Sequence, residues 1–187
     1  MGTRELRIAG FGGQGVVLSG QIVGQAASIY DNGFSTLTQS YGPEARGGSC
    51  TAEVVLSDEP IGYPYVQNPD VLIILSQEAY NKYKNGLSPE TLMIIDPDMV
   101  NSDADQIPTP LAIPATRMAR ELGRAVVANI ITLGFLAAVS DIVSPEALKN
   151  SVLTSVPKGT EEFNTRAFET GYNYGLEYGK RNGVSDG

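Results

Sequence analysis

Hydrophobic and polar residues alternate along this chain in two different patterns, short apolar runs and longer stretches with helical spacing. The apolar runs at 6–11, 70–76 and 91–98 predict buried strands, because each is a few residues long and is bounded by turn-forming residues. A further run at 109–115 is interrupted by prolines, which cannot donate to a β-ladder. We therefore expect that run to be an edge strand.

The segments between these strands have apolar residues at helical spacing. Val17, Leu18 and Ile22 begin a helix that ends before Gly33, since glycine is a common helix stop. Pro145 follows Ser144, which places proline in the first turn of a later helix. The pattern predicts helices over 16–30, 76–86, 115–123 and 125–140, from residue 144 onward, and over about 160–181.

Two further strands, 34–39 and 50–57, are joined by a short glycine-rich segment. A parallel crossover needs about a dozen residues or more, so we expect this pair to be antiparallel. The alternation of strands and helices predicts an α/β fold, a three-layer Rossmann-like domain whose sheet is mostly parallel with an antiparallel addition. We expect one domain over 1–182 and a flexible tail at 183–187.

The charge balance narrows the range of partners. The 187 residues carry 13 Lys and Arg against 21 Asp and Glu, a net charge of −8, which argues against nucleic acid or an anionic membrane as a partner. The longest apolar stretch, 125–139, is shorter than the ~20 residues of a membrane span and contains Asn129. Because the N-terminus also lacks the pattern of an export signal, we expect a cytoplasmic protein.

The residue inventory excludes several kinds of chemistry. The chain has no histidine and one cysteine, Cys50, so it has neither an internal disulfide nor the four thiolates of an iron–sulfur cluster. Asp96 and Asp98 flank Pro97 after a strand, where aspartates usually form turns rather than bind metal. We therefore predict no catalytic residue and no metal site in this chain.

The first strand ends in the glycine loop "GFGGQG", which has the spacing G-x-G-x-x-G. Such a loop brings the backbone close to a ligand and exposes the next helix's N–H groups to phosphate. A bound NAD would also need an acidic residue after the second strand, where Gln39 and Ser40 stand instead. Three interpretations of the loop stay open. It is a tight turn that only permits close packing, a site for a phosphate-bearing ligand, or a contact with the cofactor region of a partner chain. The candidate binding residues are Gly10, Gly12, Gly13, Gln14 and Gly15.

A second glycine-rich loop follows the second strand. Its Arg46 offers a planar fork that suits a carboxylate or phosphate, although a surface hairpin with a local Glu44–Arg46 pair is the plainer interpretation. Loops leaving the carboxyl ends of strands share one rim, so we expect the two loops to be neighbours. The candidates here are Ser40, Tyr41, Gly42, Glu44, Arg46, Gly47 and Gly48.

The stretches "RIAGFGGQGVVLSGQIVGQAA", "TLTQSYGPEARGG" and "NPDVLIILSQEAY" resemble the gamma subunit of 2-oxoacid:ferredoxin oxidoreductases. The resemblance extends from about residue 4 to residue 181. The stretch "QSYGPEARGG" is most similar to the 2-oxoglutarate-type enzymes, with the pyruvate and 2-oxoisovalerate types as alternatives.

This resemblance implies a complex that oxidatively decarboxylates a 2-oxoacid to its acyl-CoA and reduces ferredoxin. It implies alpha and beta partner subunits with thiamine diphosphate, a ferredoxin-like delta subunit or domain, and iron–sulfur clusters outside this chain. It also implies that the two loops complete the active-site surroundings and contribute to coenzyme A binding, with the isolated chain inactive. The alternatives are a stand-alone NAD(P)-binding oxidoreductase and a pure assembly module.

Two helices contain residues that are unusual inside a helix, a buried-type asparagine in one and a stripe of glycines in the other. Asn129 in its apolar helix is expected either to bond loop backbone at the rim or to be satisfied within the helix packing. Gly171, Gly175 and Gly179 form one helix stripe, and interior glycines indicate that another backbone approaches closely. That backbone belongs either to this chain's core or to another subunit.

Overall fold

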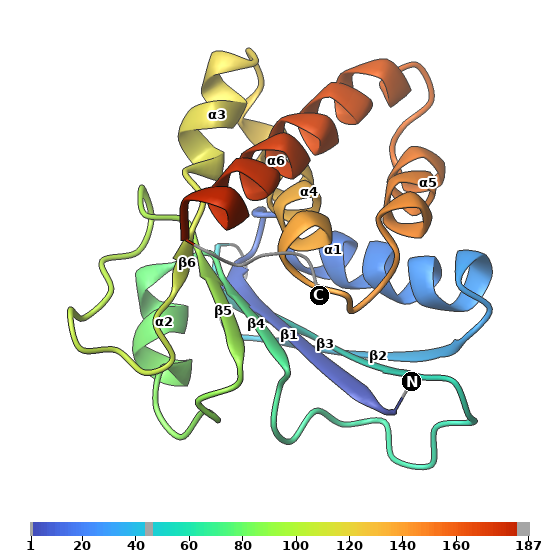
Figure 1. Ribbon diagram of the computed structural model, residues 1–187, viewed down its shortest axis with the longest axis vertical. Helices are drawn as coiled ribbons and strands as arrows, with labels where there is room; N and C mark the ends of the chain where they lie inside the picture. Colours follow the sequence, from blue (N-terminus) through green and yellow to red (C-terminus); the bar gives the residue numbers. More distant parts are fainter. Residues whose placement is uncertain (1, 44–46, 183–187) are drawn as a thin grey trace.

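The computed structural model describes residues 2–43 and 47–182, which form a six-stranded sheet covered by helices (Figure 1). The strands lie in the order β2-β3-β1-β4-β5-β6. Their bounds are β1 (Arg4–Phe11), β2 (Phe34–Tyr41), β3 (Ser49–Ser57), β4 (Val71–Ile74), β5 (Leu92–Ile95) and β6 (Leu111–Ala112).

The sheet is mixed, as the sequence predicts. β1, β4, β5 and β6 are parallel neighbours, whereas β3 pairs antiparallel with both β1 and β2. β3 lies between β1 and β2 because its apolar residues continue the buried face of β1, with Ile8 opposite Ala52 and Leu6 opposite Val54. The antiparallel addition is therefore inserted next to the first strand, an arrangement that the sequence pattern does not show.

Helices cover both faces of the sheet, which gives the expected three layers (Figure 1). Of the helices in the described residues, α2 covers one face, and the others cover the opposite face. The helices are α1 (Val16–Gln25), continued by a π-helical turn (Ala26–Tyr30), α2 (Gln77–Tyr83), α3 (Ala115–Glu121), α4 (Ala128–Val139) after a 3₁₀ turn (Ala125–Val127), α5 (Pro145–Ser155) and α6 (Glu161–Asn182).

Each face of the sheet has its own apolar core. Ile8 of β1, Ile22 of α1 and Ile131 of α4 belong to the larger core, and all three are fully buried. Leu72 of β4 and Tyr80 of α2 belong to the smaller core on the other face. Side chains on neighbouring positions of one strand therefore enter different cores, which fixes the register of the central strands.

α4 and α6 approach each other closely through glycines. A Cβ on Gly171 would overlap the carbonyl of Ile131, whose carbon would lie 2.7 Å away. A Cβ on Gly175 would lie 2.6 Å from the Cβ of Ala138. At these two positions the glycine stripe packs within the chain, and the core-packing interpretation is confirmed.

The predicted helix starts are also found. The Ser144 hydroxyl accepts a hydrogen bond from the backbone N–H of Ala147 at 3.2 Å, with Pro145 in the first turn of α5. The apolar stretch around α4 is buried in the larger core. None of the helices in the described part of the chain is both long and apolar enough to cross a membrane.

Candidate functional site

The glycine loop connects the carboxyl end of β1 to α1. Gly13 and Gly15 have φ values of +94° and +74°, a region of conformational space that favours glycine. A Cβ on Gly13 would meet no atom within 4 Å, so the loop is open at that residue. α1 starts at Val16, and no side chain caps its N-terminus.

Gln14 fixes the shape of this loop from within. Its Oε1 accepts a hydrogen bond from the Phe11 N–H at 2.6 Å, and its Nε2 donates to the Leu75 carbonyl at 2.7 Å. Gly10 leaves the space that this side chain needs, since a Cβ there would lie 2.5 Å from Oε1. The Gln14 amide therefore ties the loop to the ends of β1 and β4.

The second loop lies beside the first, as the sequence predicts. The Gly12 N–H donates to the Gly48 carbonyl at 2.9 Å, and the Gly42 N–H donates to the Ser49 carbonyl at 2.7 Å. Tyr41, at the end of β2, is 64% exposed, and Ser40 is also exposed. Gly47 has a φ of +69°, whereas Glu44 and Arg46 lie outside the described residues.

The cysteine of this chain, Cys50, lies near the rim. It lies in β3 opposite Gly10 and is buried. Burial raises the pKa of its thiol above the ordinary value, so the thiol stays protonated at neutral pH. Burial therefore disfavours the thiolate, which is the nucleophilic form of cysteine.

Asn129 of α4 lies directly against the glycine loop. Its carboxamide occupies the space where a side chain on Gly15 would be, with Cγ 2.7 Å from the position of such a Cβ. Asn129 is only 5% exposed. Among the residues that the structure describes, no hydrogen bond of the Asn129 side chain is found, and both interpretations given from the sequence stay predictions.

The loop has backbone donors available for a ligand. Among the residues that the structure describes, the N–H groups of Gly13 and Gly15 donate to no acceptor. The first α1 hydrogen bond runs from the Ser19 N–H to the Gly15 carbonyl at 2.8 Å, so the preceding N–H groups of the first turn have no partner within the helix. Such donors at a helix N-terminus bind oxyanions.

The position of β3 argues against a dinucleotide at this loop. In the usual dinucleotide fold, a parallel strand beside β1 ends in the acidic residue that binds the ribose. Here β3 lies between β1 and β2 and runs antiparallel to β1, and the residue of β3 at the rim is Ser49. The end of β2, one strand further out, is Gln39-Ser40-Tyr41.

Further along the same edge, the aspartates after β5 serve the backbone. Buried Asp96 accepts hydrogen bonds from the N–H groups of Asp98 at 2.9 Å and Thr116 at 2.7 Å. This agrees with the interpretation of these residues as turn formers. Asp98 pairs with Arg117 at 3.3 Å, and Arg117 is a half-exposed cation at the rim that the sequence pattern did not single out.

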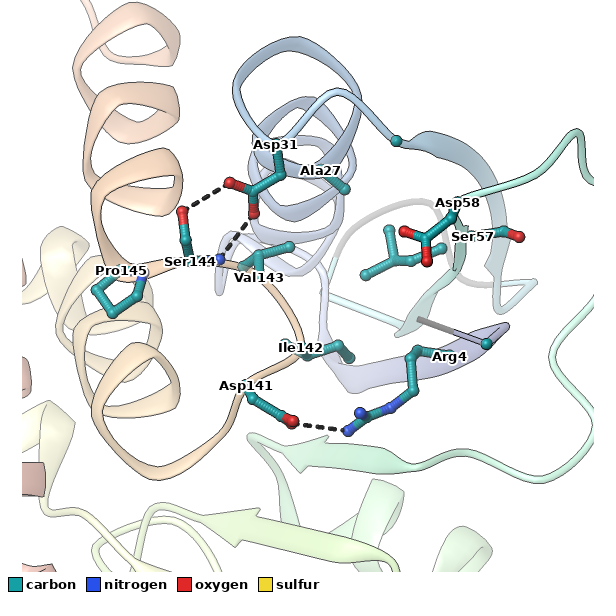
Figure 2. Close-up of a pocket in the computed structure, with 13 residues that line it drawn as sticks. Arg4, Ala27, Asp31, Ser57, Asp58, Asp141, Ile142, Val143, Ser144 and Pro145 are labelled. Carbon is teal, nitrogen blue, oxygen red and sulfur yellow. Dashed lines mark hydrogen bonds and ion pairs between the residues drawn. The ribbon is translucent and has the colours of Figure 1, made fainter. Parts of the chain in front are cut away.

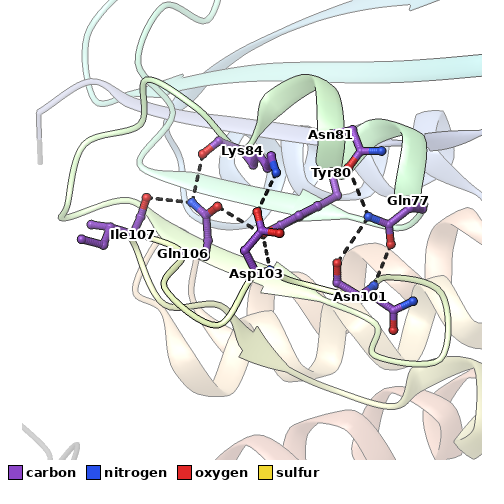
Figure 3. A network of polar contacts seen from close by, with 8 residues as sticks. All are labelled: Gln77, Tyr80, Asn81, Lys84, Asn101, Asp103, Gln106 and Ile107. Carbon is purple, nitrogen blue, oxygen red and sulfur yellow. Dashed lines mark hydrogen bonds and ion pairs between the residues drawn. The ribbon is translucent and has the colours of Figure 1, made fainter.

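A polar network holds the segment after β5 against α2 (Figure 3). Lys84 Nζ donates to Asp103 Oδ2 at 2.6 Å, and the Asp103 N–H donates to the Tyr80 hydroxyl at 2.9 Å. The hydrogen bond raises the pKa of Lys84 and lowers the pKa of Asp103. Nearer the rim, the Asn101 N–H donates to Gln77 Oε1 at 2.7 Å.

A hollow of about 450 Å³ lies at the opposite end of the sheet, away from the glycine loop (Figure 2). Its polar groups bond one another. The Asp31 carboxylate accepts from the Ser144 N–H at 2.7 Å and from the Ser144 hydroxyl at 2.6 Å, and Arg4 donates to Asp141 at 3.1 Å. These contacts hold the start of α5, so we assign the hollow a structural role.

Comparison with known proteins identifies the family. The family model described as pyruvate ferredoxin/flavodoxin oxidoreductase matches residues 5–174. The chain belongs to the pyruvate ferredoxin/flavodoxin oxidoreductase family. Within this family it is 49% identical to the 2-oxoglutarate synthase subunit KorC of Methanocaldococcus jannaschii, over 93% of this chain and 95% of that protein.

Solved structures of the family have the same fold. The gamma subunit of a keto/oxoacid ferredoxin oxidoreductase from Geobacter sulfurreducens matches with a TM-score of 0.85 and 38% identity, over 95% of this chain and 98% of that one. The resemblance to gamma subunits noted from the sequence is thereby confirmed.

More distant members of the family differ in name and in length. A pyruvate synthase subunit PorC of Methanocaldococcus jannaschii is 31% identical over 90% of this chain and 95% of that protein. The 2-oxoglutarate:ferredoxin oxidoreductase of Magnetococcus marinus, solved with 2-oxoglutarate, coenzyme A and succinyl-CoA bound, shares the fold. It does so at 24% identity and a TM-score of 0.82, over 95% of this chain and 32% of that longer chain.

Proposed function

We propose that this chain is the gamma subunit of a 2-oxoglutarate:ferredoxin oxidoreductase. The complex would oxidatively decarboxylate 2-oxoglutarate, transfer the acyl group to coenzyme A and pass the electrons to ferredoxin. The observation that carries this proposal is the 49% identity to a 2-oxoglutarate synthase subunit along nearly its whole length, against 31% to a pyruvate synthase subunit.

We assign this chain a binding role within the complex. Among the described residues, the glycine loop provides backbone N–H groups without an acceptor at Gly13 and Gly15, which suits a phosphate-bearing substrate such as coenzyme A. Gly12 and Gln14 serve mainly to shape this rim, because the Gly12 N–H and the Gln14 amide bond other parts of the chain.

The redox cofactors would belong to other subunits. Iron–sulfur clusters are held by several cysteines, and the one cysteine of this chain is buried in β3. The residues present therefore do not fit a cluster. Thiamine diphosphate is assigned to the alpha and beta partners and the clusters to a ferredoxin-like delta subunit or domain, as the family resemblance implies.

The surface is consistent with a subunit of a larger assembly. Phe34 of β2 is 45% exposed, and Tyr63 and Tyr65 are each more than half exposed. The Pro64 carbonyl accepts a hydrogen bond from Thr36 of β2 at 3.5 Å, which places these tyrosines beside the strand. Exposed aromatic side chains of this kind are enriched in protein interfaces.

Purification and assay of the native complex test the proposal. The tagged chain, isolated anaerobically from its native host, is expected to bring down larger partner chains. The complex should reduce an artificial electron acceptor with 2-oxoglutarate plus coenzyme A, and far less well with pyruvate or 2-oxoisovalerate. Omission of coenzyme A is the matched control. A chain that elutes alone, or a complex that prefers another 2-oxoacid, would contradict the proposal.

Arg46 is the charged residue proposed to contact a substrate at the second loop. Arg46→Ala is expected to raise the apparent KM for coenzyme A or the 2-oxoacid more than it disturbs assembly. Unchanged kinetics would remove Arg46 from the site. Unchanged kinetics in every loop variant would favour the assembly-module alternative, and micromolar NADH binding by calorimetry would favour an NAD(P)-binding oxidoreductase.

A further inference from the structure

The two outer strands of the sheet differ in how their edges are protected. β6 consists only of Leu111–Ala112 and has Pro110 and Pro114 on its two sides, which restrict further strand pairing. β2 has eight residues, and none of them is a proline or a charged residue. Natural sheets protect long edges with such residues or cover them, because an unpaired edge attracts other strands. The composition of β2 therefore indicates an edge that pairs with another strand.

The pairing of β2 with β3 shows which backbone groups of this edge are free. The Gly42 N–H donates to the Ser49 carbonyl at 2.7 Å, so these two residues form a hydrogen-bonded pair of the antiparallel ladder. Such pairs recur at every second residue, so the even-numbered residues of β2 point their backbone groups toward β3. The odd-numbered residues point theirs away from the sheet, and these groups bond none of the residues that the structure describes. They belong to Ser35, Leu37, Gln39 and Tyr41.

The side chains of β2 alternate between the two faces of the sheet. Leu37 faces α1, since its Cδ1 lies 3.0 Å from the position of a Cβ on Gly20. Thr36 faces the other side, where it donates to the Pro64 carbonyl at 3.5 Å. The neighbouring rings of Tyr63 and Tyr65 pack edge to face, 5.5 Å apart, and both are more than half exposed. The face that carries Thr36 therefore presents hydroxyl groups beside exposed aromatic rings.

We propose that β2 pairs antiparallel with β2 of a second copy of this chain, around a two-fold axis at Thr38. In this register Ser35 lies opposite Tyr41 of the second copy, and Leu37 lies opposite Gln39 of the second copy. Every outward-pointing residue of the edge then exchanges backbone hydrogen bonds with a residue of the same kind. The contact is isologous, and one continuous sheet runs through both copies.

A neighbouring register fits less well. An axis at Leu37 would place Tyr41 opposite Gly33, which lies before the start of β2. One outward-pointing residue at each end would then pair outside the strand. The axis at Thr38 uses the whole free edge.

The side chains of β2 favour a second copy as the occupant. In the proposed register Thr38 lies opposite Thr38 of the second copy, and Thr36 lies opposite Ser40 of the second copy. Cross-strand pairs of threonine and serine stabilise antiparallel strands, whereas like charges opposite each other destabilise them. The chain has a net charge of −8, but β2 carries no charge. Two copies therefore meet along this strand without opposing like charges.

Disulfide trapping with the full-length chain tests the register. Opposite residues at a non-hydrogen-bonded pair have Cα atoms about 4.5 Å apart, which is within the range of a disulfide. Under mild oxidation, Thr38→Cys is expected to form a covalent dimer at least about tenfold faster than the controls below. The natural Cys50 is buried, so the introduced thiol is the accessible one.

Thr36→Cys and Ser40→Cys are the matched controls, since both lie on the same face of β2 as Thr38. In the proposed register each introduced cysteine lies about 14 Å from its own counterpart, so neither chain should cross-link alone. An equal mixture of the two variants should cross-link, because residues 36 and 40 are then opposite each other. Cross-linking of Thr38→Cys no faster than either control alone would overturn the proposal.

Sedimentation of the unmodified chain measures the association directly. Concentrations up to about 0.1 mM are needed, because a single strand pair buries less area than a standard interface. Gln39→Pro removes an outward N–H without breaking the β3 ladder and is expected to weaken dimerisation at least about tenfold. Gln39→Ala keeps the N–H and should weaken it less than about threefold. Thermal melting shows whether each variant is folded.

Two further outcomes would overturn the pairing. One is an unmodified chain that stays monomeric at about 0.1 mM. The other is cross-linking of Thr38→Cys to a different subunit in the native complex, which would assign the β2 edge to that subunit. Since these measurements need neither substrate nor cofactor, the pairing does not depend on the proposed function. A dimeric chain whose complex prefers another 2-oxoacid would contradict the proposed function alone.

Discussion

Gln14 is predicted to be the residue that sets the shape of the glycine loop. Gln14→Met keeps the length of the side chain but removes two hydrogen bonds, to the Phe11 N–H at 2.6 Å and to the Leu75 carbonyl at 2.7 Å. A hydrogen bond contributes about 0.5–1.5 kcal/mol, so the expected loss in the free energy of unfolding is about 1–3 kcal/mol. For a chain of this length each kcal/mol corresponds to a fall in Tm of about 2–4 °C.

Urea denaturation of the full-length chain measures this loss. Gln39→Met is the matched control, because Gln39 is exposed in β2 and its side chain bonds no described residue. That control should change the free energy of unfolding by less than about 0.5 kcal/mol. In the assembled complex, Gln14→Met should also raise the KM for coenzyme A. Equal stabilities of the two variants would refute the role given to the Gln14 amide.

Three other changes test different parts of the fold. Gly171→Ala should lower the free energy of unfolding by about 1–3 kcal/mol, because the new Cβ meets backbone of α4 that cannot move aside, as thermal melts would show. Ser144→Ala should cost about 1 kcal/mol in urea denaturation, since α5 loses its cap. Protection of the amides at 101–106 against hydrogen exchange, measured relative to the intrinsic rate at each pH, should fall as the pH drops through the lowered pKa of Asp103, because protonation removes its charged bond to Lys84.

Each of these changes has its own control or contrary outcome. Gly24→Ala in α1 brings a Cβ no closer than 3.3 Å to the Ser35 hydroxyl, so it should be neutral or stabilise by up to about 1 kcal/mol. A Gly171→Ala variant as stable as Gly24→Ala would mean that α4 and α6 are further apart than described. Asp103→Asn should remove the acid dependence of exchange at 101–106, and an unaltered pH profile would exclude this pair as its cause.

Local signals in the sequence determine much of the fold. The buried strands, the Ser144–Pro145 helix start and the antiparallel hairpin are confirmed, because each depends on residues close together in the chain. The ends of one predicted strand differ from the observed ends because of its prolines. The strand predicted over 109–115 is only Leu111–Ala112, since Pro110 and Pro114 restrict ladder hydrogen bonds on both sides.

Contacts between residues far apart in the sequence could not be predicted from local patterns. The insertion of β3 beside β1 depends on matching apolar faces, and the spacing of residues carries no sign of it. The two candidate loops were expected to adjoin, and they do. However, the anchoring of Gln14 by Leu75 and the approach of Asn129 to Gly15 join residues far apart in sequence. The pairing of β1 with β4 and the packing of α4 against α1 bring these groups together.

The reversed direction of β3 has a consequence for how this protein could diversify. The last rim-side pair of the hairpin is Tyr41–Cys50, and the Gly42 N–H still bonds the Ser49 carbonyl beyond it. Both ends of the connecting segment are thus held by the sheet, so residues can be inserted or deleted between them without changing any strand register. The length and sequence of this segment, which adjoins the glycine loop, can therefore change during evolution while the strands that position the loop stay the same.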